Sequence, residues 1–217
     1  MISADLDLES LRRQFESAGK VTVDNFLMPE TAMRFRDYYI GLPRTKWEVS
    51  HYPRQGPDVL DTPDNQKYVA DIGSQMWQWS ERGEHARFFK RIKEDRGEIH
   101  DEVVGSFSDK IFFSTLSQIT GFDLSFTYPA IAYKYDLGCF ISRHCDKGDC
   151  KATFVYHLST EWSPEWGGLF LDLSDDSVIV PKFNRLFVFD MRDKRLPHCV
   201  TRVNVNRPRL SISSSLK

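Results

Sequence analysis

The feature that most constrains the fold is a change of hydrophobic period near residue 125. From there on, short runs rich in β-branched and aromatic residues recur, and turn-forming stretches such as DLG, WGG and SDD separate most of them. Such runs are typical of strands. They are SFTYPAIAYKY, CFISRH, KATFVYHL, GLFLDL, SVIV, RLFVFD, CVTRVNV and RLSISSS. Eight short strands at this spacing predict an all-β sandwich or barrel, of which the double-sheet jelly roll is the natural closed form.

The N-terminal half follows a helical period instead. Leu8, Leu11 and Phe15 form an i, i+3, i+7 stripe, with Asp7 as the expected N-cap and Gly19 as the stop. Further along we expect a short strand at VTVDNF, a long loop with room for one short strand at 42–68, and helices at about 29–39, 74–94 and 98–119.

The predicted fold class is therefore α+β, a double-stranded β-helix (jelly roll) with an N-terminal layer of supporting helices. We expect one domain over residues 1–217, in which the helices and loop of residues 1–124 support a jelly-roll core of residues 125–217.

Composition excludes several classes of function. A net charge of −2 gives no electrostatic case for nucleic acid or an anionic membrane as the partner. The acidic N-terminus lacks the pattern of a signal peptide, and no apolar run approaches a membrane span. The 4 cysteines form no CxxC pair and are too few for a disulfide scaffold. We expect a cytoplasmic protein with reduced thiols.

The first candidate site is the stretch RHCDKGDC, in which His144 and Asp146 stand two residues apart. Side chains at i and i+2 of a strand share a face, so both can point into a barrel while Cys145 points out. Alone this pattern is weak, because a turn with a solvated Asp produces it as easily.

His198 strengthens that pattern. It precedes CVTRVNV, and strands far apart in sequence lie side by side in a jelly roll. Two imidazoles and a carboxylate on a common face form the facial triad of non-haem Fe(II) oxygenases, which leaves coordination positions open for a reaction. We therefore take His144, Asp146 and His198 as candidate metal ligands and catalytic residues.

The last strand supplies an anchor for a co-substrate. Arg209 and Ser211 share a strand face, and together they offer a planar guanidinium fork and a hydroxyl to one carboxylate. A dicarboxylate that chelates iron through a 2-oxo acid end could pair with Arg209 at its other end, which describes 2-oxoglutarate. Arg207 is a rival of the same parity, but it lies nearer the strand start and lacks a Ser two residues later.

The order of motifs resembles the 2-oxoglutarate and Fe(II)-dependent dioxygenases, in particular the prolyl-4-hydroxylase-like branch. The motifs are HxD, WGG-x-x-x-x-L, P-x-F-N-R-L-x-x-F, PH-x-V and R-x-S-I, and they span roughly residues 128–215. The resemblance implies His144, Asp146 and His198 as iron ligands and Arg209 as the partner of the distal carboxylate. It also implies a co-substrate contact from a tyrosine before HxD, for which Tyr135 is preferred over Tyr133.

The chemistry implied by the resemblance is hydroxylation of an unactivated C–H bond with dioxygen, which converts 2-oxoglutarate to succinate and carbon dioxide. Fe(II) is the cofactor, with ascorbate as an optional reductant. A carboxylate at position 146 favours hydroxylation, because related halogenases carry a small residue there. The expected substrate is a small molecule or peptide derived from an amino acid: a prolyl residue, a free or carrier-bound amino acid, or a peptide-like metabolite.

One departure keeps other functions open. Family chains usually continue past R-x-S-I with an aromatic ending, whereas this chain ends SSSLK. A jelly-roll sensor that binds iron and 2-oxoglutarate without turnover, or a cupin-like metal enzyme with another co-substrate, is the alternative.

Other histidines and cysteines carry weaker signals. His157 is interpreted either as a satisfied core histidine or as a co-substrate contact. His51, His85 and His100 are expected at the surface. A zinc site formed by Cys145, Cys150 and His157 with His144 is disfavoured, because the spacing of structural zinc ligands is missing.

Overall fold

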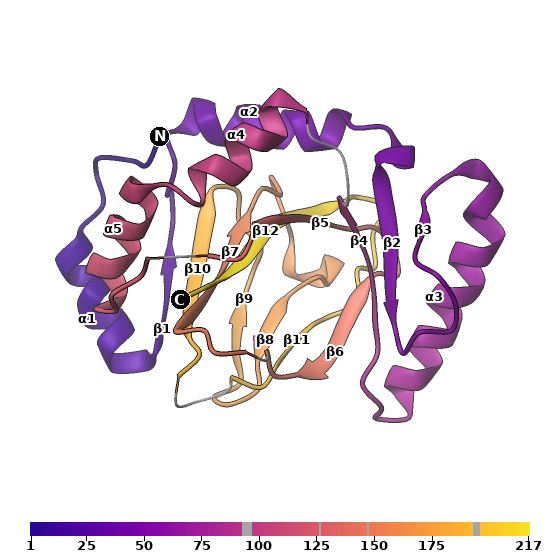
Figure 1. Cartoon of the computed structure of the whole chain (residues 1–217). Coiled ribbons are helices and arrows are strands. Elements are labelled where there is room, and N and C mark those ends of the chain that lie inside the picture. The colour runs from indigo at the N-terminus through magenta and orange to yellow at the C-terminus, as the bar shows by residue number, and fades with distance from the viewer. Residues whose placement is uncertain (93–96, 126, 147, 193–195) are drawn as a thin grey trace.

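The strands of the computed structural model form one curled antiparallel sheet, against which the helices pack (Figure 1). The structure describes residues 1–92, 97–125, 127–146, 148–192 and 196–217. Along the sheet the strands follow the order β1-β10-β7-β12-β5-β4-β6-β11-β8-β9, and β2 pairs with β4 and β3 beside this path. The sheet curls into the half-barrel of a jelly roll, which confirms the predicted fold class.

Each of the strands predicted after residue 125 is present. They are β5 (Ile131–Tyr135), β6 (Phe140–His144), β7 (Ala152–His157), β8 (Phe170–Asp172), β9 (Ser177–Ile179), β10 (Arg185–Asp190), β11 (His198–Val200) and β12 (Arg209–Leu216). The sheet order departs from the chain order, so that β12 lies between β5 and β7, and β11 lies between β6 and β8. Segments far apart in sequence thereby become neighbours, as the jelly-roll prediction requires.

The first helix confirms the signals read from the sequence. Helix α1 spans Leu8–Ala18, and the Asp7 side chain accepts a hydrogen bond from the backbone N–H of Ser10. Gly19 ends the helix with a φ of 68°, a left-handed conformation that glycine adopts without a steric penalty. Strand β1 (Lys20–Val23) and helix α2 (Pro29–Gly41) follow where strand and helix were expected.

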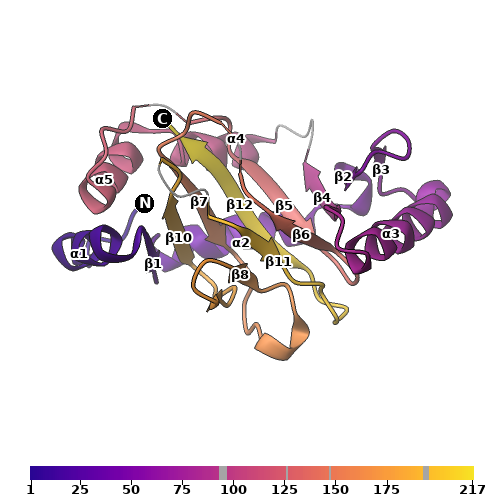
Figure 2. The same cartoon turned by 90° about the horizontal axis from the view of Figure 1, so that it is seen from below.

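Helices cover one face of the sheet and lie at both of its flanks. In Figure 1, α2 and α4 (Glu98–Ser106) run along the top, while α1 and α5 (Lys110–Thr120) lie together at the left. The view in Figure 2 places α3 (Gln66–Glu81) alone at the opposite flank. The helix-to-sheet interface is an aromatic core of fully buried rings, namely Phe26, Phe107, Phe112, Phe154 and Tyr156. These helices therefore stabilise the sheet from outside and leave its concave face for the site.

The expectation of a mainly helical N-terminal half is wrong in two places. Residues 42–68 are not a loop: they contain short helices η1 (Arg44–Lys46) and η2 (Pro63–Asn65), strands β2 (Trp47–Tyr52) and β3 (Val59–Leu60), and the start of α3. The predicted helix at 74–94 divides into the end of α3 and strand β4 (Arg87–Ile92), and the one at 98–119 divides into α4 and α5.

Burial explains why β4 was misread. The strand pairs with β2, β5 and β6, and 4 of its 6 residues are buried, with buried positions on both faces. A strand covered on both faces loses the polar–apolar alternation that would identify it. Residues 93–96, which include the end of the helix predicted at 74–94, and residues 193–195 before His198 lie outside the described residues.

Within the described ranges, no helix has both the length and the apolar character needed to cross a lipid bilayer.

Candidate active site

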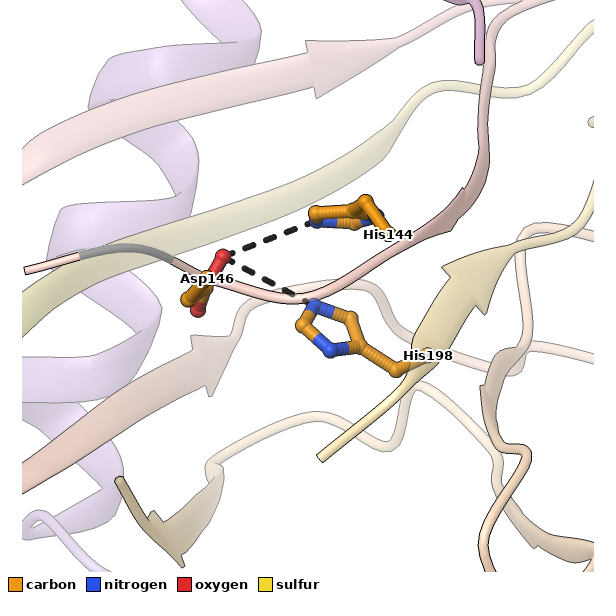
Figure 3. Close-up of side chains that lie close together, drawn as sticks. All are labelled: His144, Asp146 and His198. Atoms are coloured by element: carbon orange, nitrogen blue, oxygen red, sulfur yellow. Dashed lines mark ion pairs between the residues drawn. The ribbon is translucent and has the colours of Figure 1, made fainter. Parts of the chain in front are cut away.

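The two candidate imidazole ligands face each other across neighbouring strands. His144 ends β6 and His198 begins β11, and the antiparallel register pairs these two residues directly. Their ring centroids are 4.1 Å apart, and Asp146 follows two residues after His144 (Figure 3). The sheet order therefore brings together the residues predicted from the sequence to form a triad.

Backbone carbonyl groups orient both imidazoles. The Nδ1 atom of His144 lies 3.0 Å from the carbonyl oxygen of Ser142, and that of His198 lies 2.9 Å from the carbonyl oxygen of Leu196. Because a carbonyl only accepts, each Nδ1 carries the proton and each Nε2 presents a lone pair. Phe170 stacks on the His198 ring with centroids 4.6 Å apart, which fixes the plane of that ring.

Asp146 completes a set of three ligand atoms. Its Oδ1 lies 3.5 Å from Nε2 of His144 and 3.9 Å from Nε2 of His198, as the dashed lines in Figure 3 mark. The ligand atoms of the triad all lie within 4.8 Å of one another, and the described residues contain no other such cluster. Two neutral imidazoles and a carboxylate at this separation fit a divalent iron.

Electrostatics favour the protonation states that a metal requires. Burial lowers the pKa of His198, and the neighbouring His144 lowers it further. Burial alone would raise the pKa of Asp146, but the neighbouring His144 and His198 side chains outweigh it, so this pKa is lowered. A neutral His198 and an ionised Asp146 are the forms that coordinate metals.

The triad opens into an interior cavity of about 190 Å³. Its lining includes the triad and residues from several strands of the curled sheet, namely His85, Arg87, Phe89, Tyr133, Tyr135, Ile141, Thr153, Val155, Phe170, Phe189, Val200, Arg209, Ser211 and Ser213. The cavity therefore joins the candidate metal ligands to the candidate co-substrate anchor.

Arg209 is a buried cation without a carboxylate partner among the described residues. Only 2% of the residue is exposed, and its Nε has no hydrogen-bond partner. Its Nη1 donates to Ser211 Oγ at 3.3 Å, and its Cζ lies 4.7 Å from the centre of the Tyr135 ring. Burial lowers the pKa of Arg209, which reflects the cost of holding the charge without an anion. The pocket is therefore electrostatically incomplete without an anionic ligand.

The alternatives to Arg209 and Tyr135 were Arg207 and Tyr133, and neither has the contacts expected of a co-substrate anchor. Arg207 lies against the Trp166 ring, with Glu161 3.7 Å away, and does not line the cavity. Tyr133 does line the cavity, but among the described residues Tyr135 is the tyrosine that stacks on Arg209.

Two interpretations of the remaining histidines are wrong. His51 is not a surface residue: it lies in β2 with 2% exposed, and its Nδ1 is 3.5 Å from Asp58. His157 is not a satisfied core histidine, because it is fully buried and neither ring nitrogen has a hydrogen-bond partner in the described chain. It pairs with Ser211 across β7 and β12, beside the co-substrate anchor.

Strand β4 contributes cavity residues that were not predicted. Arg87 and Phe89 lie on the face of β4 that lines the cavity, and His85 lies two residues before the start of the strand. The alternating pattern R-x-F at residues 87–89 was the available signal, but it was read as part of a helix.

Comparison with known proteins agrees with this geometry. The sequence profile of the 2OG-Fe(II) oxygenase superfamily matches residues 130–215. A search of curated proteins by sequence found no match.

Three solved structures illustrate the shared fold. An oxidoreductase of the 2OG-Fe(II) oxygenase family from Burkholderia pseudomallei has a TM-score of 0.64 at 16% identity, covering 100% of this chain and 93% of its own. A Trichoplax adhaerens prolyl hydroxylase, solved with a peptide of hypoxia inducible factor, has a TM-score of 0.61 at 17% identity, covering 96% and 88%. A Pseudomonas putida prolyl-4-hydroxylase has a TM-score of 0.57 at 16% identity, covering 97% and 98%.

The structural similarity covers nearly the whole chain, whereas the sequence profile matches only the jelly-roll part. The resemblance read from the motifs is thus confirmed: residues 130–215 match the profile of the 2OG-Fe(II) oxygenase superfamily, and the chain has the fold of the prolyl-4-hydroxylases.

Proposed function

We propose that the protein hydroxylates an unactivated C–H bond of an amino-acid-derived substrate and releases succinate and carbon dioxide from 2-oxoglutarate. The observation that carries the proposal is a single cavity with His144, Asp146 and His198 on one side and the unpaired cation Arg209 in its depth. A metal site and a carboxylate anchor in one cavity suit a 2-oxo dicarboxylate that bridges them.

The triad would hold Fe(II), which when bound supplies the activation of dioxygen. The protein's own contribution is orientation. The carbonyl groups of Ser142 and Leu196 keep Nε2 of each imidazole free of a proton, so that neither ring has to rotate or deprotonate before binding. Asp146 supplies the negative charge that offsets part of the metal's charge.

Arg209 would bind the distal carboxylate of 2-oxoglutarate. A carboxylate there would neutralise the buried guanidinium and satisfy its Nε, while Ser211 Oγ, already within reach of Nη1, can donate to the same oxygens. Tyr135 packs against the guanidinium plane and holds it in place. These contacts fix the co-substrate at the end remote from the reacting atoms.

Apolar side chains give the cavity a dry wall. Phe170 and Phe189 pack around His198, with ring centroids 4.6 and 5.5 Å from its own. Val155 lines the same cavity. Exclusion of water by these groups strengthens the ionic contacts inside and limits side reactions.

The first test is an anaerobic titration of Fe(II)-loaded protein with 2-oxoglutarate, with ascorbate as the proposed reductant. We expect the weak visible charge-transfer band of a chelated 2-oxo acid, and its loss in His198→Ala. Arg209→Ala should retain iron but weaken 2-oxoglutarate binding by about 10- to 100-fold, the equivalent of one charge-assisted hydrogen-bonded pair. Iron binding without the band in the wild-type protein would contradict the proposal and favour another co-substrate.

A further inference from the structure

Arg87 is a second cation in the wall of the cavity. It begins β4, where it pairs with Tyr52 of β2 and with Ile141 of β6, and it lines the same cavity as the triad. The side chain is half-buried. The proposed reaction with 2-oxoglutarate assigns no role to it.

Within the described part of the chain, the charge of Arg87 has no ion-pair partner, unlike those of neighbouring arginines. Arg91, four residues along β4, contacts Glu48 at 3.1 Å and Asp58 at 3.2 Å, and Arg54 lies 3.7 Å from Asp58. Among the described residues no carboxylate comes within ion-pair distance of Arg87, and its buried Nε has no hydrogen-bond partner. A partly desolvated guanidinium without an anion is costly, and a bound anion would remove that cost.

Arg87 is half-buried whereas Arg209 is 2% exposed, so we take Arg87 to lie nearer the mouth of the cavity. A continuous row of rings separates them: Tyr135 against Arg209, then Phe89 with its centroid 5.7 Å from that of Tyr135, then the Arg87 guanidinium 5.6 Å from the Phe89 ring. Beyond Arg87, at 5.9 Å, is the ring of Tyr52, which is 46% exposed. The Tyr135 and Phe89 rings therefore lie between the two guanidinium groups.

The iron ligands lie close to this mouth. The His85 ring stands 5.1 Å from that of Tyr52 and 5.6 Å from that of His144, measured between centroids. A molecule that contacts Arg87 from the mouth is thereby next to the triad, where a substrate has to be.

We propose that Arg87 binds the carboxylate of the primary substrate and that this substrate is a free α-amino acid. The inference rests on the proposed function and narrows it. In a prolyl residue within a peptide and in a carrier-bound amino acid, the α-carboxyl group forms an amide or thioester bond, so the residue to be hydroxylated has no α-carboxylate to neutralise Arg87. One guanidinium fork matches one carboxylate, and the cavity of about 190 Å³ is smaller than those that enclose drug-sized ligands, roughly 300–1,000 Å³.

The experiment compares free L-amino acids with their amides. Succinate formation is measured with Fe(II), saturating 2-oxoglutarate and each of the twenty proteinogenic L-amino acids beside its amide, starting with L-proline and L-prolinamide. We expect at least one free acid to stimulate turnover well above its amide. Arg87→Gln should raise the KM for that acid about 10- to 100-fold with a smaller change in kcat, because the contact is remote from the reacting atoms.

Two variants serve as references. Arg87→Lys keeps the charge and loses the fork, so its KM should fall between those of the wild type and Arg87→Gln. Arg143→Gln removes an exposed arginine next to His144 that does not line the cavity, and should leave the KM unchanged. An equal response to acid and amide, no response to any free acid, or an unchanged KM in Arg87→Gln would each overturn the inference.

The anaerobic charge-transfer band distinguishes a failure of the Arg87 inference from a failure of the proposed function. If the band forms in the wild type and in Arg87→Gln with similar affinity for 2-oxoglutarate, the co-substrate site stands whatever the amino acids do. If the band is missing in the wild type, the proposed function itself has failed.

Discussion

At the scale of single residues, Gly168 controls the space available to the co-substrate anchor. It follows Gly167 in the WGG turn and has a φ of +65°, a conformation that side chains other than glycine's rarely adopt. A Cβ added there would lie 2.9 Å from Cδ of Arg209 and 3.1 Å from Cγ2 of Val203. Because the Arg209 side chain has no open space on this side, any larger residue at 168 has to displace it.

Gly168→Ala is therefore expected to weaken 2-oxoglutarate binding by about 10-fold or more, since a shifted guanidinium loses part of a charge-assisted contact. Gly83→Ala is the matched control: its φ is +77° and a Cβ there meets nothing within 4 Å. Both variants should lose about 1–2 kcal/mol from backbone strain. Titration of the charge-transfer band distinguishes them, and equal affinities in the two variants would contradict this role for Gly168.

The residues of the site differ in how far the sequence reveals them. The triad could be predicted, because His144 and Asp146 share a strand face and the sheet order of a jelly roll brings the late His198 beside them. Arg209 could be predicted because it stands two residues before Ser211 and therefore shares a strand face with it. Arg87 could not, since its position in the cavity depends on β4 being a strand, and the sequence around it suggested a helix.

At the scale of elements, a buried ionic cluster joins β3, β4 and α3. Asp61, which is fully buried, accepts hydrogen bonds from Arg44 at 2.9 Å, from Lys90 at 2.6 Å and from Gln66 at 2.9 Å. These partners outweigh burial, so the pKa of Asp61 is lowered. Lys90 also contacts Asp136 at 2.7 Å, which ties the cluster to the end of β5.

Asp61→Asn should lower the free energy of unfolding by about 3 kcal/mol, the lower end of the range for breaking a buried pair, because Lys90 retains Asp136. Urea denaturation measures this. Glu102→Gln is the control: it breaks an ion pair with Arg34 in which both side chains are partly exposed, and should cost much less than Asp61→Asn. Equal losses in the two variants would show that burial of the cluster contributes little.

The same elements explain the errors of the fold prediction. The strands after residue 125 were predictable, because turn residues separate them and their residue types favour strands. Strands β2 and β4 were missed because each is buried on most positions of both faces, so neither shows a period of two. These segments become strands because they pair with strands that are distant in sequence. Local strand propensity carries no information about such pairing.

At the scale of the whole molecule, the sheet combines strands from both ends of the chain. Strand β1 pairs with β10, and β4 lies between β5 and β6, so the first half of the chain extends the jelly roll as well as supporting it. The isolated bridge between Thr127 and Leu216 ties the start of the jelly roll to the C-terminal strand. This pairing between distant parts of the chain favours cooperative unfolding. That residues 1–217 form a single domain stays a prediction. It would be tested by following unfolding with two spectroscopic probes, which should give coincident transitions.

Cooperative unfolding makes stability sensitive to histidines that are buried in the neutral form. Burial lowers the pKa of His157 well below its ordinary value of 6.5, and the nearby cations Arg209 and Arg185 lower it further. As the pH falls below 6.5, the unfolded chain takes up a proton at this position before the folded protein does. The free energy of unfolding must therefore fall with pH, from about 6.5 down to the lowered folded-state value.

His157→Gln removes this titrating group and should flatten the pH dependence. In metal-free protein, the slope of the unfolding free energy between pH 6.5 and 5 should decrease by up to about 1.4 kcal/mol per pH unit, the contribution of one proton. Above pH 7.5, where histidine is neutral in both states, the two proteins should differ by a constant amount, which serves as the internal control. Parallel curves across the whole range would mean that His157 takes up its proton in the folded protein as readily as in the unfolded chain, contrary to its complete burial beside Arg209.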